Sequence, residues 1–262
     1  MFKSIYPTVK SQPLGFIVYE GASLIDGSPI VVIINKIFSE SQNAKTGDIV
    51  QSFIIRSDIN PLEALTTGDD AGVCGNCEHR PLLVKGGNGK APCYVNVGQS
   101  VAGVYKAYKR GRYVKASPEF VAQVLKGKTL RLGTYGDPAA SPVAVWQALA
   151  AGADKRVGYS HQWDSLGFDH AAWNELVMAS VDSIAQRVIA NAKGMRTFRV
   201  SQPDTAAIAG EISCPASAES GRKTTCSDCR LCGGTSIKAK DIVIQDHARG
   251  FNTRRVIAIV AA

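Results

Sequence analysis

The feature that most constrains the fold is the alternation of short apolar runs with helix-like segments, which begins near residue 49. Eight runs are candidate strands: Ile49–Arg56, Cys93–Val97, Thr129–Thr134, Val157–Gln162, Val177–Ser180, Arg196–Val200, Glu211–Ser213 and Ile242–Gln245. Strands that alternate with helices predict a parallel sheet, because each crossover returns the chain to the same edge. Eight strands in roughly 200 residues fit a TIM-barrel-like α/β fold. An open doubly wound sheet gives the same local pattern and remains an alternative.

The N-terminal part of the chain lacks this alternation. It contains one candidate β-hairpin, Phe16–Ile37, with turn residues at Asp26 and Gly27. We expect residues 1–48 to form a β extension packed on the barrel, and residues 49–262 to form the barrel-like domain. No linker is visible between the two, and 262 residues suit one large domain.

Local signals place several helices between the strands. Ser117 is followed by proline, a combination that is typical of a helix start. Another helix is expected over Ser183–Lys193, with Ile184, Val188 and Ile189 on its inward face.

The seven cysteines fall into two groups, and the C-terminal group is the sharper signal. It consists of Cys214, Cys226, Cys229 and Cys232, the last three spaced as C-x2-C-x2-C. This run resembles the cysteine run of bacterial ferredoxins, in which four thiolates hold a 4Fe–4S cluster. Structural zinc also takes four cysteines, usually as two separated pairs. We therefore expect an iron–sulfur cluster, with zinc or metal-free redox thiols as alternatives.

The N-terminal group, Cys74, Cys77 and Cys93, supplies only three thiolates. It is expected to hold a second cluster or a metal ion, either alone or in one composite site with the other group, and the absence of any metal is a further alternative. A fourth ligand could come from a nearby side chain, the candidates being Asp69, Asp70 and His79. Otherwise one coordination position stays open, which is how exchangeable metal sites bind substrate.

Polar side chains follow several of the candidate strands. The carboxyl ends of parallel strands form the active-site face of α/β folds. The candidate substrate-facing residues are Asp137, His161, Asp182 and His247. The aspartates have an alternative role as helix or turn caps, and His161 as a buried core histidine. The chain contains no phosphate-binding loop, dinucleotide fingerprint, G-x-S-x-G or H-E-x-x-H motif, so familiar kinase and hydrolase chemistries are not supported.

The chain is basic, with 30 Lys and Arg against 22 Asp and Glu and a formal net charge of +8. Such a charge suits a nucleic-acid partner, and equally a solubilising surface. Residues 105–115 interleave three tyrosines with five cations. Such a segment can bind a nucleic-acid backbone and stack bases, and it is equally typical of the solvent-exposed end of a helix. A zinc-stabilised nucleic-acid-binding protein is therefore the alternative function. Its expected contact residues are Lys106, Lys109, Arg110 and Arg112.

Nothing in the sequence predicts a membrane partner. The longest apolar runs, such as Pro29–Asn35, fall short of the roughly 20 residues that span a bilayer. The chain opens without a basic-then-apolar leader, so we expect a cytoplasmic protein.

Several stretches resemble a family of uncharacterised proteins encoded by bacteriophages. They are residues 20–31, 43–48, 74–77 with 93–95, 135–138, 159–163 and the final cysteine run. The resemblance spans most of the chain and implies a viral protein in the cytoplasm of a bacterial host. The family carries no established activity.

The first cysteine group is more weakly similar to that of radical-SAM enzymes, which hold three cluster cysteines after the first barrel strand. Tyr94 follows Cys93 as an aromatic residue follows the last cysteine there. The family spacing is C-x3-C-x2-C, whereas the gaps here are two and fifteen residues. The similarity implies S-adenosylmethionine (SAM) as a candidate cofactor and the second group as an auxiliary cluster. The expected function is that of a redox or radical iron–sulfur enzyme acting on a small molecule with an electron donor.

Overall fold

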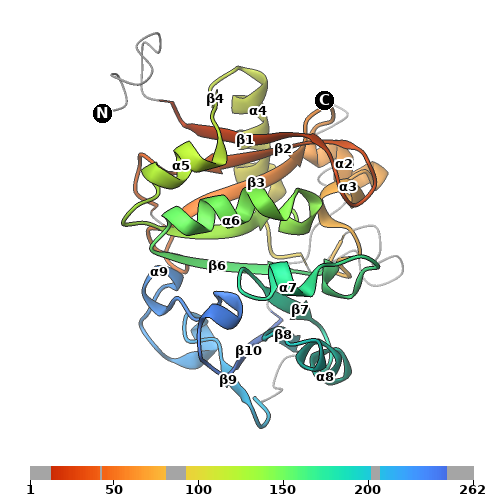
Figure 1. The fold of residues 1–262 in the computed structure, drawn as a ribbon, viewed down its shortest axis with the longest axis vertical. Helices are drawn as coiled ribbons and strands as arrows, with labels where there is room; N and C mark the ends of the chain where they lie inside the picture. Colours follow the sequence, from red (N-terminus) through yellow and green to blue (C-terminus); the bar gives the residue numbers. More distant parts are fainter. Residues whose placement is uncertain (1–12, 42, 81–92, 202–206, 247–262) are drawn as a thin grey trace.

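The computed structural model describes residues 13–41, 43–80, 93–201 and 207–246. These residues form a mixed α/β fold around one ten-stranded sheet, in the order β4-β1-β2-β3-β5-β6-β7-β8-β10-β9 (Figure 1). The strands are β1 (Gly15–Ala22), β2 (Pro29–Asn35), β3 (Val50–Arg56), β4 (Val114–Lys115), β5 (Thr129–Tyr135), β6 (Lys155–Ser160), β7 (Met178–Val181), β8 (Thr197–Ser201), β9 (Glu211–Ser213) and β10 (Asp241–Gln245).

The sheet is mostly parallel. Every neighbouring pair from β3 through β5, β6, β7, β8 and β10 to β9 is parallel, and only β2 runs antiparallel to its neighbours. The prediction of an α/β fold with a parallel sheet is therefore confirmed. In the described residues the sheet has two edges, β4 and β9, and its closure into a barrel stays a prediction.

The predicted N-terminal hairpin is present as β1 and β2. It continues the sheet, because β2 pairs with β3 along its whole length, from Ile30 opposite Arg56 to Asn35 opposite Gln51. The hairpin strands bury Phe16 and the run from Ile30 to Ile34 almost completely. The N-terminal residues thus build part of the central core.

Seven of the eight predicted strands occur, and the strand predicted over Cys93–Val97 is wrong. The chain from Cys93 to Asn96 is irregular, and Val97–Val101 forms a single π-helical turn, η1. Tyr94 and Asn96 are exposed while Val97 is buried. This alternation has the period of a half-buried strand, but it arises from an irregular segment lying on the core.

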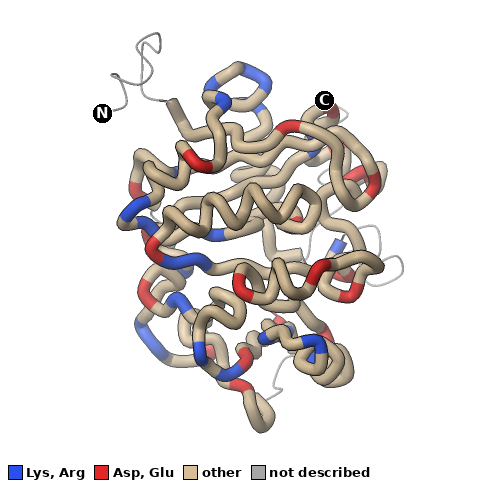
Figure 2. The backbone as a smooth tube through the Cα atoms, viewed as in Figure 1, with Lys and Arg blue, Asp and Glu red and all other residues tan. Residues whose placement is uncertain are grey.

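Helices lie between the strands as predicted. They are α2 (Pro61–Thr67), α3 (Ala71–Cys74), α4 (Ala102–Lys109), α5 (Pro118–Val124), α6 (Val143–Gly152), α7 (His170–Trp173), α8 (Ile184–Ala192) and α9 (Cys226–Cys229). Ser117 caps α5 through its hydroxyl, as expected. Figure 1 shows α5 and α6 across the near face of the sheet, and Figure 2 shows that α6 carries no charged residue. None of the described helices has the length and apolar character needed to cross a bilayer.

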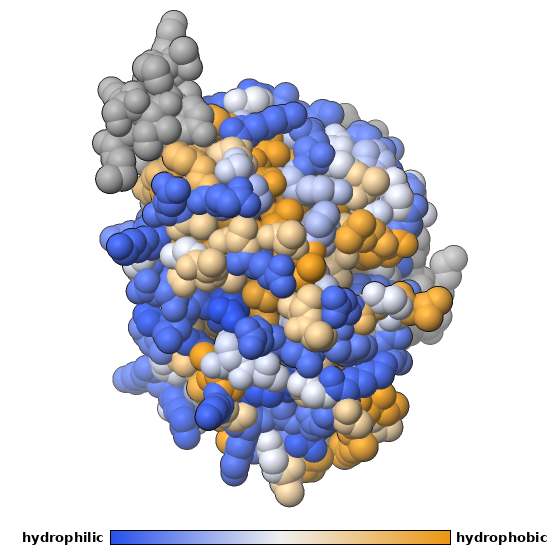
Figure 3. Space-filling view, in the orientation of Figure 1, coloured by the Kyte–Doolittle hydropathy of each residue, from blue (hydrophilic) through white to orange (hydrophobic). Residues whose placement is uncertain are grey.

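The inward face predicted for α8 is wrong. Ile184, Val188 and Ile189 are 50%, 58% and 46% exposed, and apolar atoms gather over this helix at the lower right of Figure 3. The side of α8 that faces the sheet carries Ala190 and Arg187 instead. Arg187 pairs with buried carboxylates at the β9–β10 edge, so an ionic contact orients this helix where apolar packing was expected.

Glu211 lies at the centre of that ionic contact. Its carboxylate is fully buried and accepts two hydrogen bonds from Arg199, at 2.7 and 2.6 Å. Burial is the largest influence on the pKa of Glu211 and raises it, but the bonds from Arg199 and the Ile208 N–H, with the charges of Arg199 and Arg187, together outweigh burial and the pKa is lowered. The ionised pair therefore stabilises the fold above the ordinary glutamate pKa, about 4.3, and this contribution is lost as the pH falls through the lowered value.

Arg199→Met should lower the free energy of unfolding by about 3–5 kcal/mol, because it leaves Glu211 buried without its main partner. Urea denaturation at pH 7 measures the change. Lys115→Met is the matched control, since the Lys115–Glu20 pair is largely exposed and should contribute less than about 1 kcal/mol. Equal effects of the two substitutions would contradict the role assigned to Arg199.

Candidate functional site

One cavity of about 380 Å³ lies along the parallel strands toward their carboxyl ends. Five neighbouring strands contribute to its wall: Arg131 from β5, Tyr159 from β6, Ser180 from β7, Phe198 from β8 and Ile244 from β10. Members of both cysteine groups line the same cavity, namely Cys74, Cys77 and Cys93 from the first and Cys214 and Cys226 from the second. Thiols that are far apart in the sequence thus face one space.

Cys74 ends α3 and Cys77 lies in the loop that follows, and a buried arginine fixes the shape of this segment. Arg80 donates to both carboxylate oxygens of Asp70, at 3.0 and 2.8 Å, and to the carbonyl oxygens of Gly68 and Gly75. Gly75 has φ +55°, and a Cβ atom there would lie 2.3 Å from the side-chain amide nitrogen of Gln162. The loop therefore packs directly on the chain that follows β6.

The three thiols of the first group are neutral and close to one another. Burial raises the pKa of Cys74, Cys77 and Cys93, and the nearby thiols raise that of Cys74 further. Two backbone N–H groups act in the opposite direction, since His79 donates to Cys77 and Val95 donates to Cys93. Each donor lies two residues after its cysteine. Such N–H bonds favour the thiolate that a metal requires.

The four cysteines of the second group also gather in space, although Cys214 lies twelve positions before Cys226. Cys214 follows β9, and its N–H donates to the Val243 carbonyl at 2.8 Å. The N–H of Cys226, at the start of α9, bonds the Lys45 carbonyl at 3.0 Å. The pKa of Cys232 rises to about 12, first through burial, with the nearby Cys214, Cys226 and Cys229 adding to the shift.

The second group has hydrogen-bond donors like those of the first. The backbone N–H of Ala216 donates to Cys214, again from two residues on. The hydroxyl of Tyr159 donates to Cys232. Burial still raises the pKa of Cys214 above its usual value.

Arg131 is a cavity residue that the sequence analysis missed. Its Nε atom is buried with no hydrogen-bond partner among the described residues, and its terminal nitrogen donates to the hydroxyl of Tyr94 at 2.7 Å. The Arg131 charge lowers the pKa of Cys226, although burial keeps that pKa above its usual value. A signal was present, because Arg131 interrupts the otherwise apolar strand TLRLGT.

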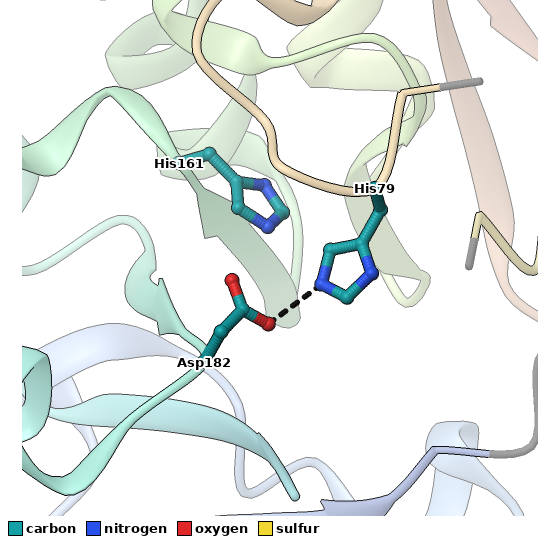
Figure 4. A group of neighbouring side chains, drawn as sticks. All are labelled: His79, His161 and Asp182. Carbon is teal, nitrogen blue, oxygen red and sulfur yellow. Dashed lines mark hydrogen bonds and ion pairs between the residues drawn. The ribbon is translucent and has the colours of Figure 1, made fainter. Parts of the chain in front are cut away.

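His79, His161 and Asp182 converge (Figure 4), and the two histidines line the cavity. His79 Nε2 lies 2.6 Å from Asp182 Oδ1, and the two imidazole rings meet edge to face with centroids 5.7 Å apart. Burial, with a smaller contribution from His79, lowers the pKa of His161 to about 4, so its ring is neutral. Burial is the largest influence on the pKa of His79 and lowers it, but the hydrogen bond and charge of Asp182, together with the charges of Asp246 and Glu78, outweigh burial and the pKa is raised.

Asp137, predicted to face substrate, has both oxygens engaged in hydrogen bonds. Oδ1 accepts from the Ala139 N–H and the Ser160 hydroxyl, and Oδ2 accepts from the His161 N–H at 2.7 Å. Burial raises the pKa of Asp137 to about 6, despite these bonds. Asp137 thus positions His161, and its catalytic role stays a prediction.

The last predicted substrate-facing residue, His247, lies outside the described residues. Of the three residues suggested as a fourth ligand for the first cysteine group, Asp70 pairs with Arg80 and Asp69 lies 3.7 Å from Arg56. His79 turns to Asp182, a partner 103 positions away that no local pattern could indicate.

The basic segment that suggested nucleic-acid binding lies on α4 and the turn before β4, at the opposite end of the sheet from β10 and β9. Its tyrosines are packed against the protein, since Tyr105 and Tyr113 are buried and Tyr108 donates to Glu20 at 2.6 Å. The ammonium group of Lys109 lies over two of these rings. Nucleic-acid binding by this segment stays a prediction.

No family model, curated protein or solved structure matches this chain. The resemblances to phage-encoded proteins and to radical-SAM enzymes therefore stay predictions.

Gly75→Ala should disturb the first cysteine loop. We expect it to lower the free energy of unfolding by about 1–3 kcal/mol more than Gly111→Ala, because only the Cβ at position 75 would meet a packed side chain. Gly111 is the matched control, with φ +64° and open space around it. Denaturation of both variants measures the difference, and indistinguishable midpoints would show that the loop does not need the close approach.

Proposed function

We propose that this protein is an iron–sulfur redox enzyme in which two cysteine-held clusters face one substrate cavity. The observation that carries the proposal is the shared cavity, lined by all three thiols of the first group and by two of the second. Scattered structural cysteines have no reason to meet in this way. A bound cluster supplies one-electron chemistry, and its potential is tuned by hydrogen bonds to sulfur and by solvent exposure.

The cysteine sulfurs are spaced more widely than a preformed zinc site requires. Zinc–sulfur bonds of about 2.3 Å in a tetrahedron bring the sulfurs to roughly 3.8 Å from one another. Within the described parts of the chain, no three cysteine sulfurs lie within 4.8 Å of each other. A cluster binds each thiolate to a different iron, so it holds the sulfurs farther apart than a single ion does.

The polar surroundings of the thiols also suit a cluster. Cys77, Cys93 and Cys214 each accept a backbone N–H from two residues on, and hydrogen bonds to sulfur stabilise the negative charge of a cluster. Arg131 places a positive charge near Cys226. These groups are fixed by the fold before any metal binds.

The first group leaves one ligand position for a cavity molecule. Its loop follows β3, the first strand of the parallel run, which supports the similarity to radical-SAM enzymes and makes SAM the candidate ligand. The wall is contributed by five neighbouring strands, which supports a barrel-like curvature of the sheet around the cavity.

The walls of the cavity combine apolar and polar side chains. Val157, Phe198, Val200 and Ile244 provide apolar surface, and Lys45, Arg131 and the two histidines are among the polar groups beside them. Apolar walls with a few placed polar groups are typical of small-molecule sites.

Protein purified without oxygen should be brown and carry iron with matching acid-labile sulfide. Cys226→Ser and Cys77→Ser should each remove the cluster of one group and leave the other, while the double variant loses both. The two groups thus serve as controls for each other, and circular dichroism verifies folding. Colourless wild-type protein that cannot be reconstituted with iron and sulfide, or zinc in place of iron, would overturn the proposal.

Arg131→Gln should lower the reduction potential of the cluster at the second group, because a nearby cation stabilises the more negative, reduced form. Potentiometric titration followed by electron paramagnetic resonance measures the shift. Lys155→Gln is the control, since this exposed lysine of β6 does not line the cavity. An unchanged potential in Arg131→Gln would place its charge outside the influence of the cluster.

A further inference from the structure

We propose that His79, His161 and Asp182 form a separate binding site for one divalent transition-metal ion on the wall of the cavity. The site uses two imidazoles and one carboxylate and needs no cysteine. It does not depend on the iron–sulfur proposal.

The three ligand atoms already converge. One nitrogen of each histidine and one oxygen of Asp182 all lie within 4.8 Å of one another, the only such group of metal-ligating side chains in the described residues. Figure 4 shows the His161 ring directed into the space between Asp182 and His79. Metal–ligand bonds of about 2.0–2.2 Å span this separation with little movement of the side chains.

The ligands come from fixed elements. His161 directly follows β6, Asp182 directly follows β7, and these neighbouring parallel strands set the spacing between them. Asp137 holds the His161 backbone, and the side-chain oxygen of Gln186 accepts from the Asp182 N–H at 2.7 Å. The other end of the Gln186 amide donates to Glu78, the neighbour of His79. Gln186 therefore connects the two sides of the site.

The donor set defines the kind of ion. Two imidazoles and one carboxylate bind zinc in hydrolytic enzymes and ferrous iron in non-haem enzymes, in each case with a coordination position open to substrate. Magnesium and calcium prefer a shell of oxygen ligands, which this group does not offer. Because His79 and His161 both line the cavity, the open position would face the same space as the thiols.

The nearest thiol explains how this site and the first cysteine group remain distinct. Cys77 Sγ lies 3.7 Å from His161 Nε2, but it falls outside the group of three ligand atoms. Cys77 lies instead with Cys74 and Cys93, whose charges influence one another. A metal ion on the histidines and Asp182 would therefore be a neighbour of the cysteine-held centre.

Cobalt(II) titration of the full-length chain tests the proposal, because thiolate ligands give intense near-ultraviolet charge-transfer bands and nitrogen and oxygen ligands do not. In protein carrying Cys74→Ser, Cys77→Ser and Cys93→Ser, we expect one equivalent of cobalt with visible ligand-field bands, in addition to any metal at the second cysteine group. Zinc and ferrous iron should compete for this equivalent, and magnesium at the same concentration should not.

Asp182→Asn and His161→Asn should each remove that equivalent and leave cysteine-bound metal unchanged. Gln186→Ala, which touches only the surroundings of the site, should weaken binding by about 10–100-fold. Asp164→Asn and His170→Asn are matched controls that should bind as the parent does, since neither residue belongs to the site. If the triple serine variant does not fold, the same substitutions are compared in the wild-type chain by zinc calorimetry.

Cobalt binding that survives both Asp182→Asn and His161→Asn would overturn the proposal. So would binding seen only through thiolate bands, or displacement by magnesium. In that case His79 and Asp182 form an ion pair and nothing more. Absence of iron and sulfide from the native protein would contradict only the iron–sulfur proposal, because cobalt binding at the histidines and Asp182 does not depend on a cluster.

Discussion

The buried pair of Arg80 with Asp70 is the interaction on which the cavity depends. Four hydrogen bonds from one guanidinium group close the loop that carries Cys74, Cys77 and His79. A buried ion pair of this kind contributes little net stability compared with apolar packing, but removing one partner is costly. Its role is geometric, because without it Cys74, Cys77 and His79 would lie on an unsupported segment.

The sheet supplies the other half of that geometry. Parallel strands carry the side chains that follow them to a common edge, so His161 after β6 and Asp182 after β7 become neighbours without any local sequence signal. The second cysteine group is fixed to the same sheet, since the Cys214 N–H bonds the Val243 carbonyl of β10. The convergence of distant residues therefore follows from topology more than from any single motif.

Much of this was predictable from the sequence, because strand and helix patterns are local. Seven strands, the N-terminal hairpin and the division of the cysteines into two groups could be read from periodicity and spacing. The strand predicted over residues 93–97 and the inward face predicted for α8 were wrong for the same reason. An alternating or amphipathic pattern shows which side chains are apolar, but not which part of the protein packs against them. Residues 93–97 meet no partner strand among the described residues, and Ile184 faces solvent because ion pairs hold α8. Pairings such as His79 with Asp182 depend on the whole fold, so no local sequence pattern predicts them.

Charge limits what the cavity can hold. Burial raises the pKa of the cysteines from Cys74 to Cys232 for which a shift is resolved, so the metal-free protein keeps these thiols protonated and the cavity close to neutral. Several buried thiolates would be costly even with Arg80, Arg131, Arg196 and Lys45 nearby. A metal bound to these cysteines would displace the thiol protons and supply the balancing positive charge. Ionisation of the thiols and metal binding would therefore occur together. The backbone N–H groups two residues after Cys77, Cys93 and Cys214 lower the pKa of these thiols and would therefore lower the cost of that exchange. The same N–H groups favour the ionised sulfur that the proposed metal would require.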